Sequence, residues 1–157
     1  MSLISSLLEP SHVALDVDAP DKKALFEHAA AILESASGLS RAQVVDSLLA
    51  RERLGSTGLG QGIAIPHGRV KGLRNPVGAF LRVRVPIPFD APDERPVSMA
   101  FVLLVPERAT DAHLQILSEL AQMFSDRELR RQLAAAPDAA SAQRLIAGWE
   151  ADTLGRL

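Results

Sequence analysis

Cysteine is absent from this 157-residue sequence. Its absence excludes disulfide frameworks, thiolate nucleophiles, CxxC redox chemistry and cysteine-ligated zinc. We therefore expect the chain to work in a reducing compartment, with the cytoplasm as its location.

The sequence also has no marked excess of positive charge. Lysine and arginine number 17 against 19 acidic residues, which gives a formal net charge of -2 at pH 7. No strong basic field is available to hold a nucleic-acid backbone, so we expect no nucleic-acid partner, although a local basic patch stays open.

Long hydrophobic runs are missing as well. The longest, residues 99–105, is far shorter than the roughly 20 residues that cross a bilayer, so we expect no membrane insertion. Residues 1–12 have no cationic region and reach Glu9 before a signal-like core is complete. They are predicted to form a short docking helix rather than a secretory peptide.

The composition, with 47% hydrophobic and 23% charged residues, is typical of one compact domain. No linker, repeat or charge block interrupts it, so we predict a single domain over residues 1–157. Apolar residues recur at helical spacing behind capping signals in five places. The predicted helices run from the signal at 18–21 to Gly38, from Ser40 to before Gly55, from Thr110 to Phe124, from Ser125 to before Pro137, and from Asp138 through Trp149.

Strand-like runs lie between these helices, at residues 63–65, 78–85 and 97–105, with a further candidate at 12–17. The near-continuous apolar run at 97–105 is typical of a sheet covered on both faces. The loop between 78–85 and 97–105 is too short for a crossover helix, so these two strands are antiparallel. We predict an α/β fold: a single layered domain with a central mixed β-sheet flanked by helices on both faces.

His67 is the most distinctive candidate for chemistry. It follows the predicted strand 63–65 and lies between Pro66, which restricts the backbone, and Gly68, which allows another chain to approach closely. This setting suits a side chain presented to a partner, although a histidine that merely fills a turn fits the same pattern. The preceding GSTGLGQG at 55–62 matches neither a Walker A loop nor GxGxxG before a helix, so a nucleotide site is not expected.

Residues 51–68, RERLGSTGLGQGIAIPHG, resemble the signature of the type-2 enzyme IIA domains of the bacterial phosphoenolpyruvate-dependent phosphotransferase system. A second block, from Phe89–Ala91 through Leu103–Pro106 to Ala112–Leu114, resembles the strand pair and second histidine of the same family. The likeness covers nearly the whole chain. It is closest to the nitrogen-regulatory members of the family.

This resemblance implies that His67 accepts a phosphoryl group from the phosphohistidine of a small phosphocarrier protein. It implies that His113 supports the transfer and that Arg51 is the active-site arginine. By pattern alone, Arg51 equally suits a helix C-terminus and His113 an exposed first turn. The family implies no metal or organic cofactor, and two imidazoles without a carboxylate make an incomplete metal site.

Four further residues are assigned to binding or supporting the phosphoryl group: Ser56, Thr57, Gln61 and Gly68. The two hydroxyls either donate to a phosphoryl oxygen or stabilise their own turn. Gln61 stands where some sugar-specific relatives have an acid. A basic edge of Arg69, Lys71 and Arg74 either steers an acidic partner or only solvates a loop.

The resemblance predicts a phosphocarrier that signals through its phosphorylation state. Its partners would be the histidine phosphocarrier protein and regulatory targets such as potassium-transport regulators or sensor kinases. One alternative is a sugar-specific enzyme IIA that passes the group to a separate enzyme IIB for fructose- or mannitol-type uptake. Another is a binding module that is never phosphorylated.

Overall fold

The structure is a computed structural model that describes residues 4–108 and 111–149. Its strands are β1 (Val13–Val17), β2 (Gly58–Gly60), β3 (Ile63–Ala64), β4 (His67–Val70), β5 (Val77–Ile87) and β6 (Val97–Pro106). Its helices are the 3-10 helix η1 (Pro10–His12), α1 (Lys22–Ser37), α2 (Arg41–Glu52), α3 (Asp111–Phe124), α4 (Arg127–Ala135) and α5 (Ala139–Ala147). None of the helices within these ranges is long and apolar enough to cross a membrane.

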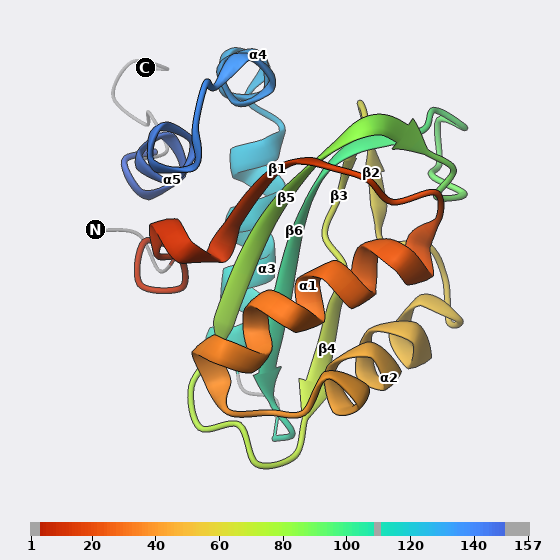
Figure 1. Ribbon diagram of the computed structural model, residues 1–157, viewed down its shortest axis with the longest axis vertical. Helices are drawn as coiled ribbons and strands as arrows, with labels where there is room; N and C mark the ends of the chain where they lie inside the picture. Colours follow the sequence, from red (N-terminus) through yellow and green to blue (C-terminus); the bar gives the residue numbers. More distant parts are fainter. Residues whose placement is uncertain (1–3, 109–110, 150–157) are drawn as a thin grey trace.

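The described strands form one six-stranded sheet in the order β1-β5-β6-β3-β2, with β4 also paired to β6 (Figure 1). The two longest strands, β5 and β6, are antiparallel, while β1 runs parallel to β5. Strands β3 and β4 run parallel to β6. The sheet is therefore mixed, as predicted from the short loop between β5 and β6.

Strands β3 and β4 follow one line along β6. Ile63 lies opposite Met99 and His67 opposite Leu103, so the register is the same on both sides of the break. The break falls at Pro66, which has no N–H to donate to the ladder, although its carbonyl still accepts from the Leu103 amide at 2.9 Å. His67 follows β3, as the sequence indicates, but it also begins β4, a strand that the sequence does not predict.

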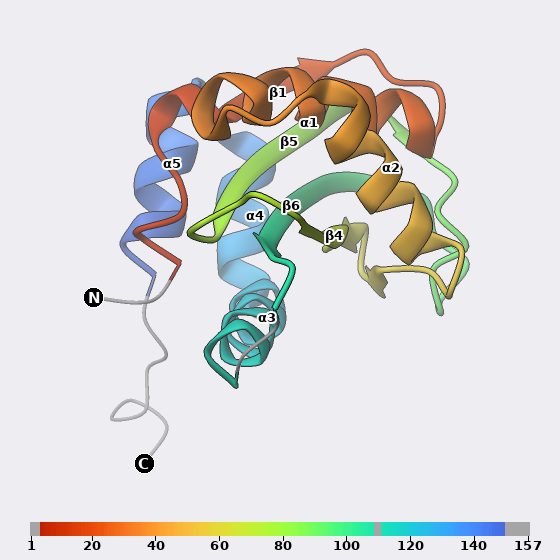
Figure 2. The ribbon, with the colours of Figure 1, turned by 90° about the horizontal axis from the view of Figure 1, so that it is seen from below.

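Helices cover both faces of the sheet. Figure 2 shows α1 and α2 on one side and α3 and α4 on the other. Alternate residues of β6 enter two separate cores: Ala100, Val102 and Leu104 pack on the α1/α2 side, and Phe101 and Leu103 on the α3–α5 side. Burial on both faces explains the near-continuous apolar run of β6. The predicted fold class is confirmed.

The capping signals predict most helix boundaries. Asp21 accepts from the Ala24 amide at the start of α1, Gly38 ends that helix at φ 77°, and Ser40 with Gln43 forms the predicted capping box of α2. Glycine is favoured at Gly38 because this left-handed conformation is strained for other residues.

Other boundaries differ from the predictions. The cap of α4 is Asp126 rather than Ser125, because the Asp126 carboxylate accepts from two amides of the first turn. Helix α5 ends at Ala147, before Trp149. Residues 4–7 form turns ahead of η1 instead of the expected docking helix. The predicted cap Thr110 lies outside the described residues.

Candidate functional site

His67 is half-buried at the first position of β4. Its Nδ1 lies 2.9 Å from the carbonyl oxygen of Ile65. A carbonyl only accepts hydrogen bonds, so Nδ1 is the nitrogen that carries the proton in this contact. In the neutral ring the lone pair therefore resides on Nε2.

The environment of His67 favours its neutral form. Burial of the ring is the largest cause of a pKa below the ordinary value of 6.5, and the positive charges of Arg51 and Arg69 lower this pKa further. The hydrogen bond to Ile65 and the negative charge of Glu52 raise the pKa without cancelling that decrease. At neutral pH the ring is thus an uncharged nucleophile.

A cavity of about 620 Å³ lies beside His67. Its lining residues are Ser47, Ala50, Arg51, Leu54, His67, Gly68, Arg69, Leu103, Val105, His113, Leu114 and Leu117. They come from α2 and the turn that follows it, and from β4, β6 and α3. Two leucines of this lining are exposed to an unusual degree, Leu54 at 84% and Leu114 at 62%. The cavity therefore combines arginines beside an imidazole with an exposed apolar border.

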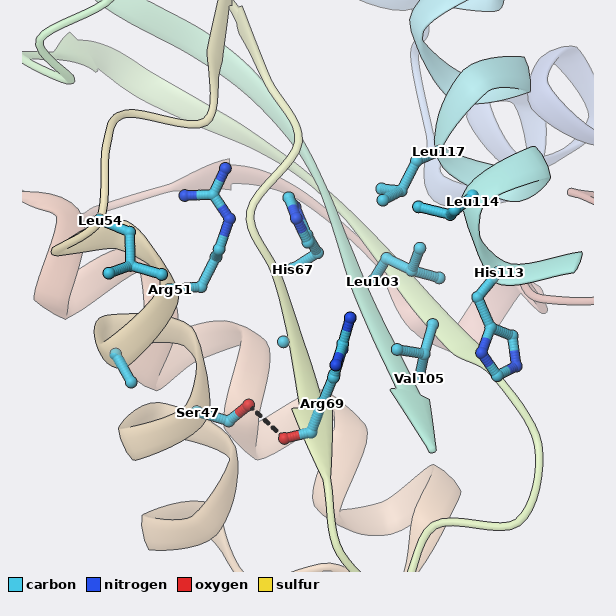
Figure 3. A pocket seen from close by; sticks show the side chains of 12 residues that line it. Ser47, Arg51, Leu54, His67, Arg69, Leu103, Val105, His113, Leu114 and Leu117 are labelled. Atoms are coloured by element: carbon cyan, nitrogen blue, oxygen red, sulfur yellow. Dashed lines mark hydrogen bonds between the residues drawn. The ribbon is translucent and has the colours of Figure 1, made fainter. Parts of the chain in front are cut away.

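Arg51 extends from the last turn of α2 and lies beside His67 (Figure 3). Its Nη1 donates to the carbonyl of Gly55 at 2.9 Å. The loop after α2 thus orients the guanidinium, and Arg51 and His67 line the same cavity.

Glu52, the next residue, was not singled out from the sequence. Only 6% of its side chain is exposed, and its carboxylate accepts from Lys22 Nζ at 2.8 Å and from the amide and hydroxyl of Thr57 at 3.0 and 2.7 Å. Lys22 also lies 4.7 Å above the ring of Phe89. This group ties α1 and the end of α2 to the following loop. Its sequence signal, an acid after Arg51 with a threonine five residues later, does not distinguish a buried carboxylate from a solvated one.

The predicted supporting residues Ser56, Thr57 and Gln61 do not line this cavity. The Ser56 hydroxyl donates to the Phe89 carbonyl at 2.5 Å and accepts from the Gly58 amide. Thr57 is buried against Glu52. These contacts match the turn-stabilising alternative for both hydroxyls.

Gln61 occupies the turn between β2 and β3 in a left-handed conformation, with φ 58°. The backbone N–H of Gln61 donates to the Asp93 carboxylate at 2.8 Å. It borders a different cavity, next to Phe124 and Arg127. The structure therefore does not bring Gln61 together with His67.

Gly68 does line the cavity, and its small size has a clear reason. A Cβ at this position would lie 2.2 Å from the Ser47 hydroxyl and 3.1 Å from the Ser47 backbone. Glycine therefore permits β4 to pack directly against α2. The chain that approaches Gly68 closely is the protein's own helix.

His113 lines the far side of the cavity, at the start of α3. Figure 3 shows its imidazole beyond Leu103 and Val105 and directed away from His67, whereas Leu114 and Leu117 point into the space between. Both histidines line this cavity, but their rings do not face each other. Within residues 4–108 and 111–149 no cluster of three or more His, Asp or Glu residues could hold a metal ion.

The chain belongs to the family described as phosphoenolpyruvate-dependent sugar phosphotransferase system, EIIA 2, whose model matches residues 6–148. The resemblance in the sequence is thereby confirmed, and the protein is a component of a phosphotransferase system.

Individual relatives indicate which members of the family this chain resembles. A nitrogen regulatory protein of Pseudomonas aeruginosa is 39% identical over 147 residues, which cover 93% of this chain and 96% of the relative. The crystal structure of nitrogen regulatory protein IIA-Ntr from Neisseria meningitidis is 51% identical, with a TM-score of 0.87 over 92% of this chain and 99% of that one. A fructose-specific EIIA component of Haloferax volcanii is 37% identical over 68% of this chain and 70% of its own length. The chain is thus most like the nitrogen-regulatory members.

Proposed function

We propose that this protein is a cytoplasmic phosphocarrier of the nitrogen-regulatory branch, in which Nε2 of His67 accepts a phosphoryl group from the phosphohistidine of a small phosphocarrier protein. The observation that carries the proposal is the contact between Nδ1 and the Ile65 carbonyl. It fixes the tautomer in which Nε2 holds the lone pair. Burial and two arginines keep that ring neutral.

The transfer needs few groups. The Nε2 lone pair attacks phosphorus, the N–P bond of the donor breaks, and the donor imidazole leaves with the bonding pair. His67 retains its Nδ1 proton throughout this step. The new phosphoryl group carries a charge of roughly -1.5 to -2. A guanidinium about 4 Å away stabilises each unit of charge by about 4 kcal/mol at an effective dielectric of about 20, before desolvation is subtracted. Arg51 is the residue proposed for this role.

Phosphorylation of the purified protein tests the assignment. Incubation with the general phosphotransfer proteins and phosphoenolpyruvate should add one acid-labile phosphoryl group, and NMR should locate it on Nε2. The His67→Ala variant should take up none. His28→Ala is a matched control, because His28 is exposed and bonds to Asp18 away from the cavity. Normal labelling of His67→Ala would sink the proposal, and a group on Nδ1 would contradict the tautomer argument.

The roles of Arg51 and His113 require a separate measurement. Alanine variants of both should remain folded, because neither side chain belongs to an apolar core. Each variant should transfer the phosphoryl group roughly 10²-fold more slowly, which is typical of the loss of an electrostatic or proton-handling group. A lower melting temperature with unchanged transfer would assign the residue to folding instead.

The proposed protein partners are those expected for a nitrogen-regulatory member of the family. We propose that a regulatory target, such as a potassium-transport regulator or a sensor kinase, distinguishes the phosphorylated from the free form, because a change of about -2 in charge alters electrostatic complementarity at the cavity. Binding should be compared for free protein, phosphorylated protein and His67→Ala. The fructose-specific relative keeps the transport branch as the second candidate. Equal affinity of all three forms, with rapid transfer to a sugar-specific enzyme IIB, would favour transport.

A further inference from the structure

Arg69 shares a strand face with His67. Successive residues of a strand alternate between faces, so positions two apart point the same way. On the opposite face, Val70 enters the core under α1 and α2, and Gly68 packs against Ser47. Arg69 lines the same cavity as His67, and Figure 3 shows its guanidinium directed along β4 toward the imidazole. The Ser47 hydroxyl donates to the Arg69 carbonyl at 2.9 Å and anchors this part of the strand.

The guanidinium of Arg69 has no hydrogen-bond acceptor among the residues that the structure describes. Over the two described ranges, no ion pair or hydrogen bond involves this group. By comparison, Arg51 is held by the Gly55 carbonyl and Arg84 by Asp18. The nearby acid Glu52 is already bonded to Lys22. Arg69 is thus a planar donor of several N–H groups beside the nucleophile, with none of these donors used.

We propose that Arg69 is a second phosphoryl-binding residue, which donates to an oxygen of the group carried on Nε2 of His67 while Arg51 binds from α2. This inference rests on the proposed function and deepens it. Two guanidinium charges would then match the charge of roughly -2 on the phosphoryl group. Arg69 would be a ligand of the modified histidine rather than part of a steering surface.

The two roles differ in what they change. A ligand of the phosphoryl group stabilises the phosphorylated state, so Arg69→Gln should lower the equilibrium constant for phosphorylation about tenfold and lower kcat at saturating donor. Arg69→Lys keeps the positive charge but lacks the planar, bidentate donor geometry of a guanidinium. It should therefore show a smaller decrease in the equilibrium constant than Arg69→Gln. Steering would instead change KM and its salt dependence while the equilibrium constant stays fixed.

Arg74 provides the matched control. It is an exposed arginine of the same basic edge and does not line the cavity. Arg74→Gln should leave the equilibrium constant and kcat at wild-type values. The melting temperature of each variant should equal that of the wild type, because Arg69 is exposed and bonds only through its backbone.

Quantification of the phosphorylated fraction against a donor of known phosphorylation potential gives the equilibrium constant directly. A selective loss in Arg69→Gln, partly restored in Arg69→Lys, supports the proposal. Equal effects of Arg69→Gln and Arg74→Gln, or an effect on KM alone, overturn it while the function of His67 stands. Failure of the wild-type protein to be phosphorylated on His67 overturns both.

Discussion

Removal of the Glu52 carboxylate should destabilise the protein far more than an ordinary surface charge would. Glu52→Ala breaks the ion pair with Lys22 and leaves two donors of Thr57 without their acceptor. Hydrogen bonds to charged groups contribute about 1.5–3 kcal/mol each, and breaking a buried ion pair costs about 3–5 kcal/mol. Lys22 retains 22% exposure and can turn toward water, so we expect a loss of about 3 kcal/mol, at the low end of these values.

Urea denaturation measures this loss. The single tryptophan, Trp149, donates to Asp126 and reports on the packing around α4 and α5 by fluorescence, while circular dichroism follows the helices. A loss of about 3 kcal/mol corresponds to a decrease of roughly 6–12 °C in melting temperature for a domain of this size. Thr57→Val is the matched control, since it removes only the hydroxyl contact with the carboxylate and should cost about 1.5 kcal/mol, the low end for a hydrogen bond to a charged group.

The same substitution should also slow phosphotransfer below the melting temperature. Glu52 holds Thr57, and the loop before Thr57 supplies the Gly55 carbonyl that orients Arg51. Transfer by Glu52→Ala should therefore be slower than transfer by Thr57→Val at equal folded fraction. If Glu52→Ala unfolds within 1 °C of the wild type, the cost of desolvating the ion pair equals its benefit and our reasoning is refuted.

Three further measurements follow from the site and its surroundings. NMR titration should place the pKa of His67 below 6.5, and because the native state then binds fewer protons than the unfolded chain, His67 should reduce stability as the pH falls below about 6.5, an effect absent in His67→Ala. Gly68→Ala should cost about 1–3 kcal/mol in urea denaturation through its clash with Ser47, and Ser47→Gly in the same chain should recover part of this loss. Arg82→Met should cost about 2 kcal/mol in the same assay, because the Arg82 guanidinium donates to carbonyls at the C-terminal end of α4.

Much of the fold could be predicted because its signals are local. Capping residues such as Asp21 and Ser40 bond within three positions, so their role is visible in the sequence. The mixed sheet followed from one short loop. Strand β4 was missed because its residues, HGRV at 67–70, have little strand character of their own. Its conformation depends on pairing with β6, more than 30 residues away.

The site divides in the same way. Arg51 and His67 lie in one contiguous block of the sequence, residues 51–68. The resemblance of this block to the family was therefore enough to identify both residues, which line one cavity. The directions of the Ser56 and Thr57 hydroxyls depend instead on Phe89 and on the burial of Glu52. Such contacts are set by tertiary packing, and a turn motif fits either direction.

The break between β3 and β4 connects these observations to the chemistry. The Ile65 N–H donates to the Thr57 carbonyl at 3.0 Å, just beyond the residues through which β2 pairs with β3. The Ile65 carbonyl points to the same side of the strand, where the pairing with β2 has ended. It therefore accepts from Nδ1 of His67 rather than from a neighbouring strand. Pro66 fixes the backbone between them. Since Thr57 is itself held by Glu52, the buried acid at the end of α2 constrains both the arginine that faces His67 and the carbonyl that selects its tautomer.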